Sequence, residues 1–369
     1  MTRFGIEEEF LFLDVHSLVP VALAAGTRER ITRLRTGGEV TKEYLTSQIE
    51  CLTEPVSTAT DAEAQLSHLR ALIGWHAQEQ RAIAAGTGTP FATTRSSAVS
   101  PSPHYDDVAA QLGHLTRDHE VNGLHVHIEV VDDEERVRAI NRVRGWLPTL
   151  LALTGNSPFV NGRDSGYASW RSILIRRLPA SWSPPRFHDF DDYRTQVRRL
   201  IDLQAITEAS SLAWAVRISE RFPTIEVRVF DAQLTAEDSV LAALLSRALV
   251  LTDDQPQADI GVDGLDASLW AAARRGMDAR VIDPTNGDIE DVRVVADRML
   301  AMIAPALRQL GDEERVGTGI ERLRMVGTGA DRQRGSVDEE GTAGLARLLL
   351  AGTPAPRPAP PLSMPTRAV

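Results

Sequence analysis

Four stretches of this sequence alternate apolar and polar residues, and in each stretch the polar positions carry side chains suited to chemistry. These side chains are Glu7 and Glu9 in residues 2–13, Gln48 and Glu50 in 42–55, His125, His127 and Glu129 in 123–132, and Glu226 and Arg228 in 224–231. Successive side chains of a β-strand point to opposite faces, so each set shares one face of its strand. The alternation is typical of an antiparallel sheet with one open, polar face, and not of a parallel sheet buried on both faces.

The first stretch, "TRFGIEEEFLFLD", places three consecutive carboxylates among apolar residues. In a strand, Glu7 and Glu9 face one way and Glu8 faces the other. Two like charges on a partly buried face are unfavourable unless a positive group lies between them. Taken alone, the stretch fits a solvated edge strand equally well.

Carboxylates and imidazoles on four strands together indicate the wall of a site that binds hard cations through oxygen ligands. Oxygen ligands with a minority of histidine, and without thiolates, suit Mg²⁺ or Mn²⁺ better than zinc. Mg²⁺ commonly bridges carboxylates to substrate phosphates, so several such ions imply a triphosphate. Arg228, beside Glu226, would then face the charge that develops on a transferred phosphoryl group.

Several functions fit such a sheet. A phosphotransferase of the guanidino-kinase type could use it, and so could an ATP-dependent ligase. A zinc amidohydrolase would place its His-x-His pair near the start of the chain, whereas here the pair is central and only His188 follows it. A non-catalytic protein explains the aligned carboxylates least well. No Gly-x-x-x-x-Gly-Lys loop occurs, so ATP would have to be held through metals on the sheet.

Charge and cysteine content narrow the class of protein. The formal net charge of the 369 residues is -11, which argues against nucleic-acid or anionic-membrane partners. Cys51 is the only cysteine, so no disulfide can form within the chain and a reducing compartment is expected. No apolar run is long enough to span a bilayer, and the N-terminus lacks a signal-peptide pattern. We therefore expect a soluble, cytoplasmic protein that acts on small molecules.

Helical patterns separate the predicted strands. They predict helices over residues 61–84, 134–155 with a restart at Pro148, 191–206 and 235–252. Residues 156–190, rich in Gly, Pro, Ser and Arg, indicate a long loop of the kind that carries function. We expect an α+β fold with one catalytic domain over 1–350, comprising a sheet-bearing core to about 252 and a mostly helical part over 265–350. The Pro-rich residues 351–369 are predicted to be disordered.

Six motifs of this sequence match motifs of a known family, and they occur in the same order as in that family. They are "FGIEEEF", "SQIECLTEP", "NGLHVHIEV", "LTGNSPFVNGRDSGYASWRS", "RISERFPTIEVRVFD" and "GTGADRQR", and they run from residue 4 to residue 334. The sequence resembles the carboxylate-amine ligases related to glutamate–cysteine ligase, most closely the short bacterial group called the YbdK family. The resemblance implies a glutamine-synthetase-like fold, in which a curved, mainly antiparallel sheet with an acidic metal-binding face is flanked by helices.

The resemblance also implies a function. It is ATP-dependent activation of a glutamate-type carboxylate as an acyl phosphate, followed by attack of an amine, with weak glutamate–cysteine ligase activity in a homodimer. It implies catalytic roles for Arg228 and Glu226 and substrate contacts for Tyr167 and Arg171. It implies metal-ligand roles for Glu7, Glu9, Glu43, Glu50, His125 and Glu226.

Two positions need more than the family pattern. Glu43 and Glu50 are separated by an odd number of positions, so on one straight strand they would face opposite ways. Both can reach one site only if a turn or bulge lies between them. His127 shares a face with His125 and is expected to contact substrate or to support the ligands.

Overall fold

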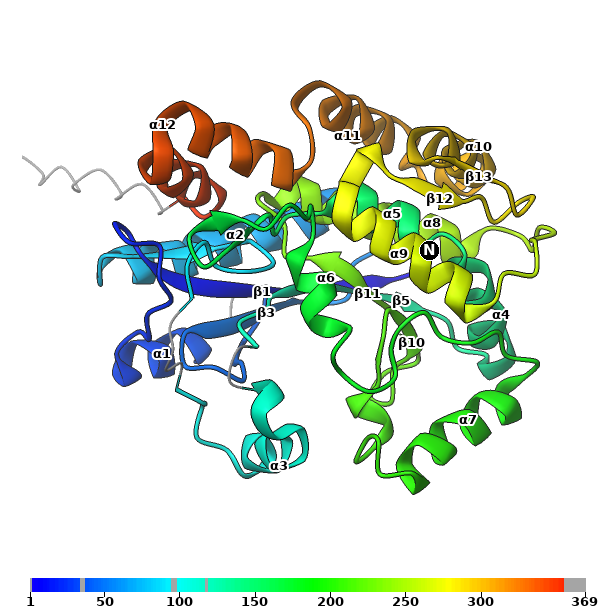
Figure 1. Ribbon diagram of the computed structural model, residues 1–369, viewed down its shortest axis with the longest axis horizontal. Coiled ribbons are helices and arrows are strands. Elements are labelled where there is room, and N and C mark those ends of the chain that lie inside the picture. The colour runs from blue at the N-terminus through cyan, green and yellow to red at the C-terminus, as the bar shows by residue number, and fades with distance from the viewer. Residues whose placement is uncertain (1, 34–36, 94–97, 117–118, 355–369) are drawn as a thin grey trace, which may run out of the picture.

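The computed structural model describes residues 2–33, 37–93, 98–116 and 119–354, and its centre is a seven-stranded sheet (Figure 1). Six strands follow the order β10-β11-β5-β1-β3-β2, and β4 pairs with the C-terminal half of β1. All of these pairs are antiparallel. The strands are β1 (Phe4–Asp14), β2 (Gly38–Lys42), β3 (Gln48–Thr53), β4 (Ala82–Ala85), β5 (Gly123–Glu129), β10 (Val216–Ile218) and β11 (Thr224–Asp231). The expected antiparallel sheet is therefore confirmed.

Helices lie on both sides of this sheet, and the side that carries α5 and α8 packs against the apolar positions of the strands. Figure 1 shows α2, α5 and α8 to α12 on one side and α1, α3 and α7 on the other. The helices are α1 (Ala25–Thr32), α2 (Ala59–Gln78), α3 (Pro103–Leu112), α4 (Asp133–Arg144), α5 (Leu147–Thr154), α6 (Trp170–Ile175), α7 (Phe190–Asp202), α8 (Ala236–Leu251), α9 (Val262–Arg275), α10 (Val292–Leu310), α11 (Glu313–Val326) and α12 (Gly329–Gly352). Short strand pairs, β6 (Phe159–Val160) with β7 (Arg163–Asp164), β8 (Ser181–Trp182) with β9 (Ala213–Trp214), and β12 (Arg280–Ile282) with β13 (Ile289–Asp291), complete the fold.

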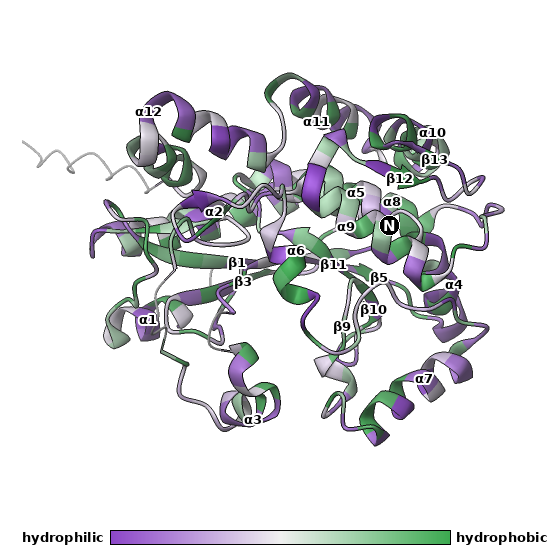
Figure 2. Ribbon diagram, in the orientation of Figure 1, coloured by the Kyte–Doolittle hydropathy of each residue, from purple (hydrophilic) through white to green (hydrophobic). Residues whose placement is uncertain are grey.

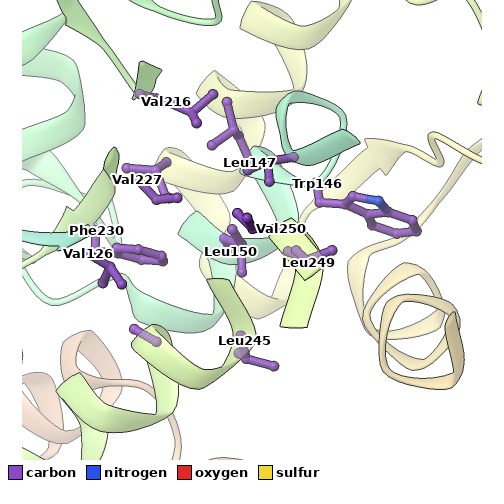
Figure 3. Packing of buried hydrophobic residues seen from close by; sticks show 14 of the residues in the cluster. Val126, Trp146, Leu147, Leu150, Val216, Val227, Phe230, Leu245, Leu249 and Val250 are labelled. Atoms are coloured by element: carbon purple, nitrogen blue, oxygen red, sulfur yellow. The ribbon is translucent and has the colours of Figure 1, made fainter. Parts of the chain in front are cut away.

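The apolar positions of the strands form the core on the packed side. Figure 2 shows hydrophobic residues concentrated along the central strands and on the helix faces turned toward them. In the close view of Figure 3, side chains of three strands meet those of α5 and α8; they are Val126, Val216, Val227, Phe230, Leu147, Leu150, Leu245, Leu249 and Val250. All of these side chains are buried. Burial of this face leaves the other face of the sheet for polar side chains.

Glu8 lies on the packed face, as its position in the strand predicts. Its carboxylate is 1% exposed and accepts hydrogen bonds from Nε and Nη2 of Arg70 in α2, at 2.9 and 2.6 Å. Arg70 also donates to the backbone carbonyls of Gln233, Leu234 and Gly352. This buried ion pair therefore joins β1, α2, the start of α8 and the end of α12.

The helix predicted over 61–84 is wrong in its last part. The helix α2 ends at Gln78, and residues 82–85 form β4 instead. Arg81 takes a positive φ of 56°, a conformation that ends a right-handed helix, and the chain then pairs with β1. Pairing of β4 with the second half of β1 satisfies backbone groups that a continued helix would leave unpaired. The predicted restart at Pro148 is confirmed, because α5 begins at Leu147.

The C-terminal part contains a short strand pair, β12–β13, as well as the expected helices. The helix α12 continues to Gly352, and the Thr353 hydroxyl donates to the carbonyl of Ala84 at 2.8 Å. Most of the predicted tail, residues 355–369, lies outside the described residues. Within the described ranges, no helix combines the length and apolarity needed to cross a membrane.

Candidate active site

Strand register brings the predicted site residues together on the open face. Glu7 lies opposite His125, Glu9 lies opposite Glu50, and Glu226 lies opposite His127. Directly opposed residues of an antiparallel pair point to the same face. Four neighbouring strands, β3, β1, β5 and β11, therefore contribute to one acidic surface.

Arg228 joins this surface at a β-bulge in β11. The register of β11 against β5 shifts between Val227 and Phe230, so an extra residue lies opposite the segment that holds His125. Bulges bend a strand and redirect its side chains, and they are frequent beside active sites. Nη1 of Arg228 lies 3.3 Å from Nδ1 of His125 and donates to the carboxylate of Glu226.

Glu226 is held by a second arginine that the sequence analysis did not identify. Nε of Arg217, on the adjacent strand β10, donates to Glu226 Oε2 at 2.8 Å. Arg217 also donates to the carbonyls of Ser210 and Leu212, which orient its guanidinium. Arg217 is the one polar residue among the apolar residues 213–218, and such a short segment does not predict a strand by itself.

Three groups of side chains have the composition and spacing of metal sites. They are Glu7, His127 and Glu226; Glu7, Glu50 and His125; and Glu9, Glu43 and Glu50, and within each group the potential ligand atoms all lie within 4.8 Å of one another. Oxygen-rich sets with at most one imidazole suit Mg²⁺ or Mn²⁺. The turn between β2 and β3 brings Glu43 to the side of Glu50, which resolves the odd spacing of these two residues.

The acid groups in this surface repel one another. Burial raises the pKa of Glu9 to about 8, and the negative charge of Glu43 is the second cause of this rise. Burial, followed by the charges of Glu7, Glu43 and Glu9, raises the pKa of Glu50 well above its ordinary value. A cation among these groups would favour their charged forms. The crowding of carboxylates therefore fits a site for divalent cations.

Other members of the surface are already in the state that a metal ligand needs. Burial would raise the pKa of Glu226, but the charges of Arg228 and Arg217 hold this pKa well below its ordinary value. Burial, and then the charge of Arg228, lowers the pKa of His125 to about 4, so its imidazole is neutral at pH 7. Nε2 of His127 is buried without a hydrogen-bond partner and lies 3.3 Å from a carboxylate oxygen of Glu7. The neutral imidazole of His125 beside these carboxylates is therefore a competent ligand.

A cavity of about 320 Å³ opens beside the acidic surface, and Glu9, His125, Arg171 and Arg228 line its inner end. The Arg171 side chain is 6% exposed, and its Nε makes no hydrogen bond. A Cβ on Gly123 would lie 2.4 Å from Nη2 of Arg171, so any larger residue at this position would displace the guanidinium. A buried guanidinium at a cavity is suited to bind an anionic group.

Asp231, which the sequence analysis did not identify, supports Arg171. The Asp231 carboxylate is fully buried and accepts hydrogen bonds from Asn156 N, Ser157 Oγ and Ser169 Oγ at 2.7–2.8 Å. Ser169 in turn caps α6, and Ser157 Oγ accepts from the backbone N–H of Arg171. One oxygen of Asp231 lies 4.0 Å from Nη1 of Arg171. These contacts position the loop segment that delivers Arg171.

A second cavity, of about 230 Å³, adjoins Glu7 and His127 on the other side of the acidic surface. Its walls include Phe4, Pro55 and Phe222, and the Phe222 ring meets the His127 imidazole edge-on at 5.9 Å. Apolar walls beside a few polar groups are typical of small-molecule sites.

Tyr167 is the one predicted site residue that does not join this arrangement. Its ring packs against Trp170 and Trp270 and lies under the guanidinium of Arg274, at 5.1 Å from the ring centre. It lines neither of the two cavities. The other nine predicted residues lie together, and their roles in binding metal and substrate stay predictions.

Comparison with known proteins identifies the family. Residues 3–348 match the family model of glutamate–cysteine ligase family 2. A relative from Mycobacterium sp. strain KMS, named as a glutamate–cysteine ligase 2-2, is 37% identical over 341 residues, which cover 89% of this chain and 92% of the relative. A relative of the same name from Saccharopolyspora erythraea is 36% identical over 358 residues, with 95% and 92% covered.

Two solved structures share the fold at low sequence identity. One is a glutamate–cysteine ligase from Francisella tularensis in complex with AMP, with a TM-score of 0.72 and 14% identity over 95% of this chain and 87% of the other. The other is a bifunctional glutathione synthetase from Pasteurella multocida, with a TM-score of 0.72 and 14% identity over 95% of this chain and 52% of that chain. The expected fold class, a glutamine-synthetase-like sheet flanked by helices, is confirmed. The chain belongs to glutamate–cysteine ligase family 2, a family of ATP-dependent ligases that form carbon–nitrogen bonds.

Proposed function

We propose that this protein is a carboxylate-amine ligase that activates a glutamate-type carboxylate as an acyl phosphate at the expense of ATP and joins it to an amine. The observation that carries the proposal is the joint presence, on one sheet face, of three potential metal groups and Arg228, next to a cavity that contains the buried Arg171. A carboxylate is a poor electrophile, and phosphorylation makes its carbon open to attack.

The reaction has two steps. An oxygen of the substrate carboxylate attacks the γ-phosphorus of ATP, so a carboxyl O–P bond forms and the P–O bond to ADP breaks. The nitrogen of a neutral amine then attacks the acyl carbon. A C–N bond forms, the C–O bond to phosphate breaks, inorganic phosphate leaves, and the nitrogen loses one proton.

The side chains of the acidic surface divide between two tasks. Bound Mg²⁺ or Mn²⁺ would supply positive charge that offsets the triphosphate, and the carboxylates and imidazoles of the three groups would hold these ions. Arg228 reaches the same region from the bulge and presents a planar, two-point donor to the oxygens of the transferring phosphoryl group. Arg217 keeps the Glu226 carboxylate oriented toward these groups.

The two cavities suit the two kinds of substrate. The cavity with Arg171 would take the acid substrate, with a carboxylate of that substrate paired to the guanidinium. The apolar cavity beside Glu7, His127 and Phe222 would take the base of the nucleotide, because its walls favour an aromatic ring and its inner end is a metal group. Tyr167 has no part in this arrangement, although it remains within the motif that resembles the family.

The test is capture of the intermediate. With ATP, Mg²⁺ and glutamate, hydroxylamine should yield a γ-glutamyl hydroxamate, since it is a small nucleophile that needs little recognition. Glu226→Ala should lower the yield by at least about a hundredfold, because a metal group and the partner of two arginines are lost. Glu220→Ala, an exposed position in the turn between β10 and β11, is the matched control and should leave the yield unchanged.

A result would contradict the proposal if ATP were consumed with glutamate and no hydroxamate formed. Retention of the phosphoryl group on a stable product, without release of inorganic phosphate, would instead indicate a phosphotransferase. Hydroxamate formation from a different carboxylic acid would keep the ligase class and change only the acid substrate. Weak activity with cysteine, a homodimer and a cytoplasmic location belong to the same proposal, and sizing chromatography and cell fractionation test the last two.

A further inference from the structure

We infer that the amine acceptor carries an apolar group, an alkyl or arylalkyl chain, and binds with this group in the outer part of the cavity that contains Arg171. The inference rests on the proposed ligase function and names the class of its second substrate. The bond that forms is the C–N bond described above, with phosphate as the leaving group and one proton lost from nitrogen.

Charge is distributed unevenly in this cavity. Among the described residues that line it, two carry carboxylates, Glu9 and Glu43, and two carry guanidinium groups, Arg171 and Arg228. All four lie at the end formed by the sheet and its metal groups. The remaining lining residues are apolar or uncharged. Burial lowers the pKa of His119, which also lines the cavity, to about 4, so this imidazole is neutral at pH 7. The chemistry of activation therefore occupies one end, and at the other end none of the described lining residues carries a full charge, although the guanidinium of Arg177 acts on His119 from outside the cavity wall.

One wall of the outer part is a single face of α3. Tyr105, Val108 and Leu112 follow one another at spacings of three and four residues, and all three line the cavity. The Tyr105 hydroxyl donates to the carbonyl of Lys42 at 3.0 Å, and its ring meets the ring of Tyr44 edge-on at 5.5 Å. An aromatic pair and two aliphatic side chains thus form this wall.

The facing walls come from two segments far away in the sequence. Ile175, Leu178 and Pro179 lie at and after the end of α6, the helix that contains Arg171. Ile206 and Leu212 come from the connection between α7 and β9. Together with the uncharged polar residues Gln111, Thr116, Ser210 and Ser211, these apolar side chains line the part of the cavity away from the sheet, through which an acceptor would reach the acyl phosphate.

This distribution discriminates between classes of amine. An α-amino acid such as cysteine brings a carboxylate, and burial of an unpaired carboxylate against uncharged walls is strongly unfavourable. Each methylene of an apolar amine gains instead from burial, by about fourfold in affinity. An acceptor with several carbon atoms and no charge beyond its amine fits these walls better than cysteine does.

A homologous series of acceptors tests the inference. Methylamine, ethylamine, propylamine and butylamine differ in apolar length but have nearly equal basicity, and 2-phenylethylamine, ethanolamine, glycine and cysteine complete the set. The assay is ADP release by the full chain with ATP, Mg²⁺ and glutamate, and hydroxamate formation in the same preparation is the reference. We expect kcat/KM to rise about fourfold per methylene until the cavity is filled, and butylamine to exceed ethanolamine, glycine and cysteine.

Two asparagine substitutions in one helix link the effect to the wall. Val108→Asn places an amide in the cavity, whereas Ala110→Asn places the same side chain on the exposed side of α3. Val108→Asn should lower kcat/KM for butylamine by about fivefold relative to methylamine, and Ala110→Asn should leave both values unchanged.

The outcomes separate the two proposals. Hydroxamate formation with a flat dependence on chain length, or with cysteine preferred to butylamine, would overturn the inference about the acceptor and leave the ligase function in place. Absence of hydroxamate with every acid tried would overturn the ligase function and the inference with it. If Val108→Asn fails to fold, the dependence on chain length in the unaltered protein still decides.

Discussion

Three consecutive glutamates in β1 should respond in opposite ways to the same substitution. Glu8→Gln should destabilise the fold and leave the active face intact, because Glu8 is buried with Arg70 on the helix-packed side. Glu7→Gln and Glu9→Gln should abolish activity, because both residues lie in the acidic surface, and Glu9→Gln should do so without lowering stability. The substitution exchanges a carboxyl group for an amide of nearly the same size, so position alone decides the outcome.

The magnitude for Glu8→Gln follows from its surroundings. The change leaves the Arg70 guanidinium, 2% exposed, without its counter-ion. Breaking a buried ion pair from one side costs about 3–5 kcal/mol. Three carbonyls still accept from Arg70, which favours the lower end of this range. With an unfolding entropy of about 2.1 cal/mol/K per residue over some 350 residues, the melting temperature should fall by about 4–7 °C.

The assays are thermal unfolding without metal and hydroxamate formation with ATP, Mg²⁺ and glutamate. Glu9→Gln should raise or preserve the melting temperature, since it removes one carboxylate from a crowded face where burial and Glu43 raise the pKa of Glu9 to about 8. The reasoning is refuted if Glu8→Gln melts like the unaltered protein and loses activity, or if Glu9→Gln loses stability and keeps activity.

Three further predictions concern the same site. Arg228→Lys should lower kcat by about 10²–10³ and change ATP affinity little, because lysine lacks the planar two-point donor. Steady-state kinetics and equilibrium binding measure the two effects, and near-normal turnover would remove Arg228 from the mechanism. Asp231→Asn should raise KM for the acid substrate by about tenfold and change kcat less, because three hydrogen-bond donors and Arg171 lose their charged partner. An unchanged KM would count against a positioning role for Asp231. Without divalent cations, the melting temperature should fall as pH rises from 4.5 to about 8. The reason is that the folded pKa of Glu9 lies above its unfolded value, so stability present at low pH is lost through this range. Mg²⁺ should reduce the fall in a thermal unfolding series, and an equal fall with and without Mg²⁺ would contradict a metal at Glu9.

The period of two in each strand was enough to assign side chains to faces from the sequence. It separated Glu7 and Glu9 from Glu8, and it placed His125 with His127 and Glu226 with Arg228. This works because the alternation of a strand is a local property of its backbone, independent of the partner strands. The N-cap of α8 at Thr235 is predictable for the same reason, since a cap depends on residues within one helical turn.

Local pattern could not decide which residues meet across the sheet. Register pairs Glu9 with Glu50 and Glu226 with His127, and the bulge turns Arg228 toward His125. These features depend on contacts between strands far apart in the sequence. The end of α2 at Gln78 has the same origin, because pairing with β1 outweighed the helical pattern of residues 79–84.

Loop residues show the limit most clearly. Arg171 and Tyr167 stand four positions apart in one motif, yet the structure brings Arg171 to the cavity and packs Tyr167 against α9. The difference comes from Asp231 at the end of β11, whose buried carboxylate binds Ser157 and Ser169 and thereby orients the start of α6. The sequence by itself therefore determined the acidic face and the types of side chain on it, whereas tertiary packing alone decided which side chains reach the site, because only folding brings Asp231 to a loop more than 60 residues before it.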